Sequence, residues 1–291
     1  MSQRTPGQVY AALQKLAREQ GRTSQQLFEL YAHERFLARL AASRLAQRFV
    51  LKGGMLLAVL DVRRPTRDAD LLVRGLVNEP EALRAVVEEI AAVPMSDGVL
   101  FDSTAMTIES IREDADYPGV RVKVPAGLAG ARLRLTVDMS FGDPIVPRRI
   151  DYPTLLDGES FALLGYPLES VIAEKAITML SLGDANTRDR DYADVYLLSC
   201  VHSIDAAAMR SALRVVGEHR GVELRPLRAV LETLGQSRQR SWAAFRARVG
   251  IDALPERFSD VVEAVVAFVD GLPADGGARW SPADWGWDSG G

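Results

Sequence analysis

Cysteine and lysine are the two residue types that this sequence nearly lacks. Its 291 residues include one cysteine, Cys200, and four lysines against 31 arginines. A single cysteine excludes an internal disulfide framework and any metal site built from several cysteines. No segment approaches the roughly 18 uninterrupted apolar residues of a membrane span, and the first residues lack the apolar core of a signal peptide. We therefore expect a cytoplasmic protein in a reducing compartment, with no membrane among its partners.

Two common phosphate-binding motifs are also missing. The sequence has neither a G-x-x-x-x-G-K-[ST] loop nor a Rossmann G-x-G-x-x-G turn, which excludes P-loop and dinucleotide-binding functions. The formal net charge of −4 argues against a surface that binds nucleic acid everywhere. A genome rich in G and C would produce the excess of arginine. The lysines that persist are nevertheless candidates for positions that need a compact point charge.

Hydrophobic periodicity divides the chain into a helical start, a run of strands and a helical end. Helical spacing in residues 7–47 is followed by strand patterns in roughly 49–51, 68–73, 105–111, 120–125 and 131–141. After Pro167 the pattern predicts helices at roughly 168–182, 187–200, 204–218, 224–235, 238–249 and 255–271. This order predicts an α+β (mixed α/β) fold, in which a mixed sheet flanked by helices precedes a C-terminal helical bundle.

The same pattern suggests three regions along the chain. We expect N-terminal helices and an α/β catalytic domain in residues 1–166, a helical domain in 167–273, and a tail rich in Gly, Pro and Trp in 274–291. A flexible tail is the default expectation. Three tryptophans between residues 280 and 287 argue that part of it packs on something.

Asp68 and Asp70 form a D-x-D pattern at the start of a predicted strand. Residues i and i+2 lie on one face of a strand, so both carboxylates point the same way. The two charges repel each other, and a divalent cation bound between carboxylates and substrate phosphates resolves the conflict. Asp138 offers a third carboxylate on a later strand, on the face opposite its apolar residues. The alternative, and the commoner explanation of an isolated D-x-D, is solvated residues at strand ends.

Gly53 and Gly54 stand between a predicted strand and a short predicted helix. Glycine exposes backbone N–H groups and a helix N-terminus favours anions, so this turn could hold triphosphate oxygens. Taken alone, the pair is explained equally well as a plain tight turn. Lys52, directly before it, could contact phosphate or cap the turn.

These motifs occur in an order that resembles a known fold. Strand, Gly53-Gly54, short helix, Asp68-x-Asp70 and a later Asp138 resemble the nucleotidyltransferase fold of polymerase-β-like enzymes. More narrowly, the segment RFLARLAASRLAQRFVLKGGMLLAVLDVRRPTRDADLLV is similar to the abortive-infection Eii (AbiEii) family of toxin nucleotidyltransferases, which includes the MenT toxins. TVDMSFGDP resembles the strand of the third carboxylate, LESVIAEKAITML the E-x-x-x-x-K helix, and TRDRDYADVYLL the closing D-x-x-D helix. The resemblance covers about residues 25–200.

The resemblance implies transfer of a nucleoside monophosphate from an NTP to a hydroxyl acceptor. Asp68 and Asp70 would then bind Mg²⁺ or Mn²⁺, and Asp138 would complete the metal site or act as base. Gly53, Gly54 and Lys52 would bind the nucleotide, and Arg67 is a further candidate for a phosphate contact.

The two later motifs supply candidates on predicted helices. Lys175 lies mid-helix among apolar residues, where a lysine either extends to water or reaches into a cleft, and its point charge suits a β- or γ-phosphate. The motif's acidic residue is Glu169 or Glu174. Asp191 and Asp194 share one helix face and would orient Lys175 or the nucleotide. The alternative is a salt-bridged surface with Arg188 and Arg190.

A partner antitoxin and an RNA acceptor also follow from the resemblance. MenT-type enzymes modify the 3′ end of tRNA, so we expect a toxin of a type IV-like toxin–antitoxin pair that blocks translation. A phosphate on Thr66 would place about −1.5 to −2 charges beside the metal carboxylates and block the site; the alternative is a simple turn threonine. Residues 238–248 carry arginines around Trp242 and Phe245, which suits RNA or, equally, an amphipathic helix.

Two other functions remain open on the sequence alone. A metal-dependent nuclease or phosphohydrolase could use the same carboxylates, although the glycine turn and Lys175 anticipate a triphosphate. A non-catalytic nucleotide-binding protein is the third possibility, and the complete set of Asp68, Asp70 and Asp138 argues against it.

Overall fold

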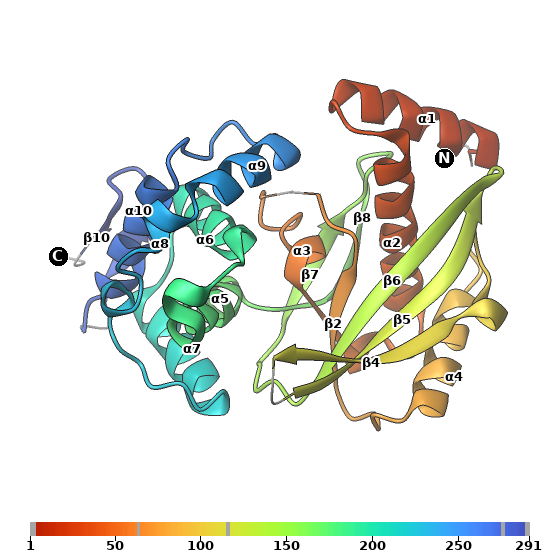
Figure 1. Ribbon diagram of the computed structural model, residues 1–291. Helices are drawn as coiled ribbons and strands as arrows, with labels where there is room; N and C mark the ends of the chain where they lie inside the picture. The colour runs from red at the N-terminus through yellow and green to blue at the C-terminus, as the bar shows by residue number, and fades with distance from the viewer. Residues whose placement is uncertain (1–3, 63–64, 115–116, 275–276, 289–291) are drawn as a thin grey trace. The chain divides into compact units, whose positions relative to one another are not determined.

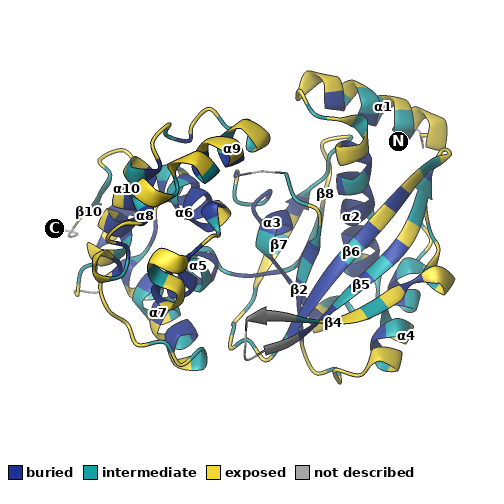
Figure 2. Cartoon of the chain, in the orientation of Figure 1, coloured by how far each residue is buried: buried dark blue, intermediate teal, exposed yellow. Residues whose placement is uncertain are grey.

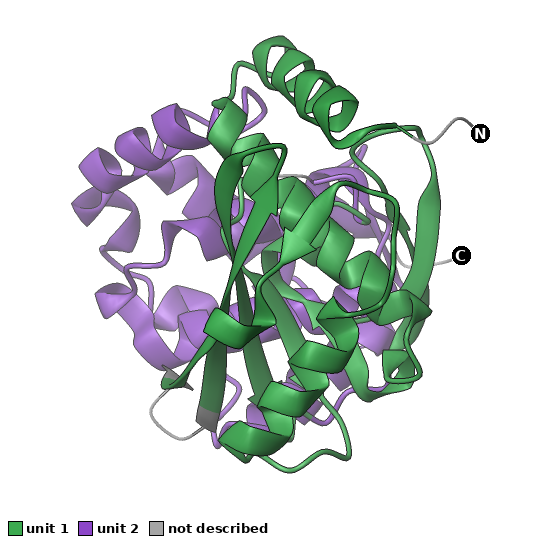
Figure 3. Ribbon diagram, turned by 90° about the vertical axis from the view of Figure 1, so that its right-hand side faces the viewer, with its two compact units in different colours: residues 1–59, 65–143, 147–166 green, residues 60–64, 144–146, 167–291 purple. Residues whose placement is uncertain are grey.

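The computed structural model describes residues 4–62, 65–114, 117–274 and 277–288. The chain divides into two compact units, which Figure 3 shows in different colours. Unit 1 comprises residues 1–59, 65–143 and 147–166, and unit 2 comprises residues 60–64, 144–146 and 167–291. The domain limits expected from the sequence stay predictions.

Unit 1 is built on a mixed sheet in which the described residues form eight strands (Figure 1). The order is β3-β5-β6-β2-β1-β8-β7, and β4 also pairs with β5. The β2–β6 and β1–β8 pairs are parallel, and the other pairs are antiparallel. This mixed sheet, with helices around it, confirms the predicted fold class. The strands are β1 (Phe49–Lys52), β2 (Ala69–Val73), β3 (Val99–Phe101), β4 (Thr107–Asp114), β5 (Tyr117–Leu128), β6 (Ala131–Phe141), β7 (Arg148–Pro153) and β8 (Ser160–Gly165).

Along strand β6, apolar and polar side chains alternate between the two faces of the sheet. Leu133, Leu135 and Val137 are buried on one face, whereas Arg134 on the other face is exposed. The predicted alternation is therefore confirmed. Because side chains alternate along a strand, Asp138 lies on the face opposite these apolar residues.

The α-helices that the described residues form in unit 1 are α1 (Pro6–Glu19), α2 (Ser24–Ala42), α3 (Gly53–Leu56) and α4 (Pro80–Ala91). Thr5 and Thr23 begin α1 and α2 with capping boxes, in which Gln8 and Gln26 return the hydrogen bond. Apolar residues of α1 and α2 form a buried cluster with residues of β3, β5 and β6: Val9, Leu13, Phe28, Tyr31, Ala32, Val99, Leu128 and Leu133.

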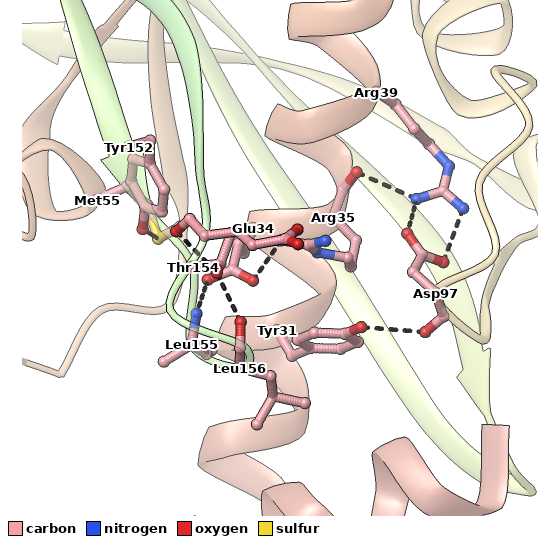
Figure 4. Close-up of polar contacts among 11 residues, drawn as sticks. Tyr31, Glu34, Arg35, Arg39, Met55, Asp97, Tyr152, Thr154, Leu155 and Leu156 are labelled. Carbon is pink, nitrogen blue, oxygen red and sulfur yellow. Dashed lines mark hydrogen bonds and ion pairs between the residues drawn. The ribbon is translucent and has the colours of Figure 1, made fainter. Parts of the chain in front are cut away.

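Buried polar contacts also fix α2 in place (Figure 4). Arg39 donates to both carboxylate oxygens of Asp97 at 2.6 and 3.1 Å, and both side chains are buried. Glu34, which is fully buried, accepts the backbone N–H of Leu155 at 2.7 Å and pairs with Arg35 at 2.6 Å. Buried charges require such partners because their desolvation is costly. These contacts give α2 one orientation on the sheet.

Unit 2 contains the helices α5 (Leu168–Leu182), α6 (Asp189–Val201), α7 (Ala206–His219), α8 (Leu234–Ser237), α9 (Gln239–Val249) and α10 (Phe258–Asp270). The predicted helix at 224–235 is wrong, because that segment holds only a 3-10 turn at Leu227–Ala229 before α8 begins. Distant carboxylates accept its backbone N–H groups instead. Asp270 accepts those of Leu227 and Arg228, and Asp184 accepts those of Thr233 and Leu234.

The C-terminal segment forms a two-stranded sheet of β9 (Arg279–Ser281) and β10 (Gly286–Asp288). Trp280 is 1% exposed, and its indole N–H donates to the carbonyl of Ser199 at 2.7 Å. Trp287 donates to the carbonyl of Phe268 at 2.9 Å and stacks on its ring. The described part of this segment is therefore packed rather than free; residues 275–276 and 289–291 of the expected tail lie outside the described residues.

Figure 2 shows the buried faces of these elements in dark blue. No helix in the described ranges is both long enough and apolar enough to cross a membrane.

Candidate active site

Four charged residues lie opposite one another across four neighbouring strands of unit 1. Lys52 of β1 is opposite Asp70 of β2, Asp70 is opposite Asp138 of β6, and Asp138 is opposite Arg121 of β5. Residues opposite each other in a sheet point to the same face. We call Lys52, Asp70, Asp138 and Arg121 the charge row. It places two carboxylates side by side between two cations.

Arg121 and Asp138 form a two-pronged ion pair at one end of the charge row. The Nε and NH2 groups of Arg121 donate to the two oxygens of Asp138 at 2.7 and 2.5 Å. Asp138 is 5% exposed. The hydrogen bond to Asp138, with the nearby charges of Asp68 and Asp70, raises the pKa of the Arg121 guanidinium.

Gly53 makes room for the carboxylate of Asp70. Its φ of +62° is strained for other residues, and a Cβ at this position would overlap with the Asp70 side chain. The backbone N–H of Gly54 lies 3.4 Å from Oδ2 of Asp70. The glycine pair thus has a structural function, because it leaves space for the Asp70 carboxylate beside the start of α3. Its predicted role in binding phosphate stays a prediction.

Asp68 lies just before β2, and its neighbours differ from those of Asp70. The hydroxyl of Thr66 donates to the carboxylate and to the carbonyl of Asp68, both at 3.3 Å. Asp68 and Thr66 are half-buried and Arg67 is exposed. Thr66 is therefore close enough for a modification to change the charge directly beside Asp68.

His33 of α2 lies at the end of β2 that precedes Asp70. His33 is buried, at 2% exposed. Its Nε2 lies 3.1 Å from the backbone N and O of Thr136 in β6. The strands β2 and β6 begin to pair at Ala69 and Val137, one residue after Thr136. The imidazole of His33 therefore interacts with backbone groups of Thr136 that have no partner in β2. Burial lowers the pKa of His33.

At the other end of the charge row, Lys52 is held by Asp143. Oδ2 of Asp143 lies 3.2 Å from Nζ of Lys52 and accepts hydrogen bonds from Ser140 at 3.2 Å and Tyr166 at 2.6 Å. Lys52 is 6% exposed, and its ammonium lies over the ring of Tyr166. Burial opposes ionisation of Asp143, but Lys52, Tyr166 and Ser140 hold its pKa below the usual range. No side-chain hydrogen bond of Lys52 caps α3.

The donor set suits a magnesium ion bound by two carboxylates. Asp68 and Asp70 are half-buried and separated by one residue, and Mg²⁺ is commonly held by one or two carboxylates together with substrate phosphates and water. Within the described ranges no group of three or more carboxylate, imidazole or thiol side chains is arranged to hold a metal ion. The assignment of Asp68 and Asp70 as metal ligands stays a prediction. The expectation that Asp138 is a third ligand stays a prediction.

The remaining candidates form a second cluster, in unit 2. Nζ of Lys175 in α5 lies 3.0 Å from Oδ1 of Asp191 and 2.8 Å from Oδ2 of Asp194, both in α6. Arg188 pairs with the other oxygen of Asp191 at 2.7 Å. Asp191 and Asp194 are buried, and Asp191 pairs with Arg188 and, at 4.0 Å, with Arg190, the two partners of the salt-bridged alternative. Burial opposes ionisation of Asp191, but Lys175 and Arg188 lower its pKa to about 2. Glu174 instead pairs with Arg220 at 3.7 Å.

The arginine-rich helix α9 is anchored through the side chains that were candidates for RNA stacking. Trp242 and Phe245 are buried, and the indole of Trp242 donates to the carbonyl of Pro255 at 2.9 Å. Arg238 is paired with Asp189 at 2.8 Å, and Arg246 donates to the carbonyl of Leu254. Base stacking on Trp242 or Phe245 is therefore excluded by their burial, and the interpretation as an amphipathic helix is confirmed.

Comparison with known proteins identifies the family. Residues 35–264 match the family model described as "Nucleotidyl transferase AbiEii toxin, Type IV TA system". The chain belongs to the AbiEii family. The expected family is thus confirmed, and with it the assignment as a nucleotidyltransferase of a type IV toxin–antitoxin system. The nearer resemblance to MenT toxins stays a prediction.

Two crystal structures from Helicobacter pylori are similar to this AbiEii protein. One, of a protein assigned as a nucleotidyltransferase, is 16% identical with a TM-score of 0.46, covering 86% of this chain and 99% of that chain. The other, JHP933, is 17% identical with a TM-score of 0.45, covering 85% of this chain and 91% of that chain. No curated protein matches the sequence. The family assignment therefore rests on the match to the family model.

Sequence reasoning missed two residues of the site, Arg121 and Asp143. Both lie in recognisable segments, Arg121 in the strand pattern of β5 and Asp143 in the SFGDP turn after β6. Neither carries a local motif, because each is defined by its partner across the sheet. Only the register of β5 on β6 identifies Arg121 as the counter-ion of Asp138.

Replacing Gly53 with alanine tests whether the space left by the missing side chain of Gly53 positions the carboxylate of Asp70. Gly21 is the matched control, because it has the same φ of +62° but nothing within 4 Å of the place that a Cβ would take. We expect Gly21→Ala to cost about 1–2 kcal/mol in free energy of unfolding through backbone strain alone. Gly53→Ala should cost more and should also weaken Mn²⁺ binding, because Asp70 must move. Urea unfolding measures the free energy of unfolding, and titration with Mn²⁺ measures metal binding. Equal losses of unfolding free energy in the two variants, with unchanged Mn²⁺ binding, would contradict the role of Gly53 in positioning Asp70.

The depressed pKa of Asp191 predicts a pH-dependent contribution to stability. When the pKa of a carboxylate is lower in the folded than in the unfolded state, its ionised form stabilises the fold at pH values above the unfolded-state pKa. This stabilisation is lost as the pH falls through the folded-state pKa. We expect Asp191→Asn to be less stable than wild type by about 2 kcal/mol near pH 7, with the difference shrinking below about pH 4. Urea unfolding at several pH values measures it. Exposed Asp252→Asn is the control, and a pH-independent difference for Asp191→Asn would refute the assignment.

Proposed function

We propose that this AbiEii protein transfers a nucleoside monophosphate from an NTP to an RNA acceptor, the 3′ end of tRNA, and so blocks translation. The observation that carries the proposal is the placing of Asp70 and Asp138 side by side on one sheet face, with Asp68 two residues before Asp70. Adjacent carboxylates repel each other, which favours a site that receives cations. The family supplies the reaction class, and the tRNA acceptor comes from the resemblance to MenT toxins.

In the proposed reaction, the acceptor hydroxyl oxygen forms a bond to the α-phosphorus while the bond to the β-phosphate oxygen breaks. Pyrophosphate leaves, and the hydroxyl proton passes to a base. A divalent ion, Mg²⁺ or Mn²⁺, would neutralise the phosphate charge when held by Asp68 and Asp70. Such positioning and charge neutralisation account for most of the catalysis in phosphoryl transfer.

The residues of this chain have distinct proposed tasks. Asp70 is held in position by the close approach of Gly53, and Lys52, fixed by Asp143, brings a positive charge to the same row. In unit 2, Asp191 and Asp194 hold the ammonium of Lys175 in one place, where it would neutralise charge on the departing phosphates. Preorganised charges of this kind stabilise a transition state without having to reorganise during the reaction.

The test is a transfer assay with total tRNA, Mg²⁺ and each labelled NTP in turn. We expect label on the tRNA 3′ end with wild type, and a loss of at least about a hundredfold in Asp70→Asn and Lys175→Ala. Exposed Asp151→Asn and Lys15→Ala are matched controls that should retain activity. Shortened RNA without NTP would indicate a nuclease instead. No labelling with any NTP would overturn the proposal.

We further propose that the partner antitoxin acts on this site through phosphorylation of Thr66. The hydroxyl of Thr66 lies 3.3 Å from the carboxylate of Asp68, so a phosphate there would add negative charge where the cation must bind. We expect a mass increase of one phosphate, mapped to Thr66, after co-expression with a neighbouring antitoxin gene, together with loss of transfer activity. Thr66→Val should remain active and resist inhibition. Full inhibition of an unmodified protein would exclude this route.

A further inference from the structure

The imidazole of His33 joins helix α2 to strand β6 at the point where β2 begins. Its Nδ1 lies 2.6 Å from the carbonyl oxygen of Glu29, one turn earlier in α2, and its Nε2 lies 3.1 Å from the backbone N of Thr136. The histidine is 2% exposed. A polar ring in the protein interior needs partners for both nitrogens, and these two contacts supply them.

The two contacts also assign the tautomer of His33. A carbonyl oxygen only accepts, so Nδ1 carries the proton that is donated to Glu29. The backbone fixes the direction of the Thr136 N–H, which points at Nε2, so Nε2 accepts this hydrogen bond. The carbonyl oxygen of Thr136 also lies 3.1 Å from Nε2, but a proton on Nε2 would face the N–H. Burial lowers the pKa of the imidazole, which favours the same neutral form.

The N–H of Thr136 lies at the end of the β2–β6 ladder. The two strands pair from Ala69 and Val137 onward, and β2 begins at Ala69. One residue earlier in β6, the N–H of Thr136 donates to the imidazole of His33. A buried backbone N–H has to be paired, and here a side chain of α2 supplies the acceptor in place of the chain that precedes β2. That chain is therefore not required to continue the ladder.

The position of Asp68 follows from this early end of the ladder. Asp68 lies just outside β2 and is half-buried, whereas Asp70 lies within the ladder, opposite Asp138. Burial lowers the pKa of the His33 imidazole, and the charge of Asp68 opposes this effect, so the two side chains lie within electrostatic reach of each other. The contact between His33 and Thr136 thus sets the point at which the chain of Asp68 joins the sheet.

We propose that His33 is the positioning residue of Asp68. By accepting the hydrogen bond of the Thr136 amide, its imidazole ends the β2–β6 ladder at Ala69 and keeps Asp68 outside the strand. His33 touches neither the cation nor the nucleotide, and acts through the backbone of β6 and the start of β2. This inference rests on the proposed function, in which Asp68 holds a divalent ion.

Amide hydrogen exchange at Thr136, measured by NMR on the full chain without metal, tests the hydrogen bond itself. We expect this amide to be protected in wild type and to exchange faster in His33→Leu, which has no acceptor. His33→Gln should restore protection, because its carboxamide oxygen reaches the position of Nε2, whereas the shorter side chain of His33→Asn should not. Equal protection of Thr136 in wild type and His33→Leu would overturn the proposal.

Titration of the same variants with Mn²⁺ alone, followed by electron paramagnetic resonance of the free ion, tests the effect on Asp68. Replacing a residue that orients a metal ligand lowers metal affinity by about 10–100-fold. We therefore expect Mn²⁺ binding to weaken by about tenfold or more in His33→Leu and His33→Asn, and to stay within about threefold of wild type in His33→Gln. Unchanged Mn²⁺ affinity in His33→Leu or His33→Asn would overturn the proposal. Two loss variants keep the test decisive if one of them does not fold.

The matched control is Tyr31→Phe in the same helix. The hydroxyl of Tyr31 donates to the carbonyl of Asp97 at 3.1 Å in a buried contact, so this change removes one hydrogen bond of α2 and none of Thr136 or Asp68. We expect Tyr31→Phe to keep both the protection of Thr136 and the Mn²⁺ affinity of wild type. A loss of Mn²⁺ affinity as large as in His33→Leu would show that a looser α2 is the cause, and the proposal would fail.

The outcomes separate this inference from the proposed function. If the variants show the expected exchange and Mn²⁺ binding but wild type transfers no nucleotide to RNA, the inference stands and the proposed function is wrong. If His33→Leu binds Mn²⁺ and transfers nucleotide as well as wild type does, the proposed function stands and the inference is wrong. No Mn²⁺ binding by wild type would remove the ion from Asp68 and overturn the inference.

Discussion

Electrostatic repulsion between neighbouring carboxylates is the constraint on which the site of unit 1 depends. Asp70 and Asp138 occupy opposing positions on adjacent parallel strands, with Asp68 close by. A sheet tolerates such an arrangement only when positive charge compensates for it. The flanking strands supply that charge from both sides, Arg121 from β5 and Lys52 from β1. The two cations and two anions of the charge row balance each other, and Asp68 adds one further negative charge beside it.

The backbone around the charge row is adapted to the same constraint. Gly53 lacks a side chain where the carboxylate of Asp70 must lie, and its left-handed conformation turns the chain from β1 into α3. Asp143 follows β6 and binds Lys52, Ser140 and Tyr166 through one carboxylate oxygen. In unit 2 the same solution appears on helices, where Asp191 and Asp194 fix Lys175.

Local patterns predicted those parts of the protein whose physical cause is local. The alternation along β6 and the helix at 168–182 follow from the spacing of neighbouring residues, and the structure contains them. The helix expected at 224–235 failed because Asp184 and Asp270, both distant in sequence, bind its backbone. The burial of His33 and Trp242 likewise depends on what the rest of the chain places around them.

The family and the reaction class could be predicted from the sequence by itself, because motif order and strand periodicity are properties of the linear chain. Only the tertiary structure decided which charges face one another. The register of β1, β2, β6 and β5 brings Lys52, Asp70, Asp138 and Arg121 into one row, although they are separated by up to 86 positions along the chain. Register is set by packing and turn geometry over whole strands. For that reason Arg121 carries no signal in the sequence, yet it forms the closest described contact of the third carboxylate.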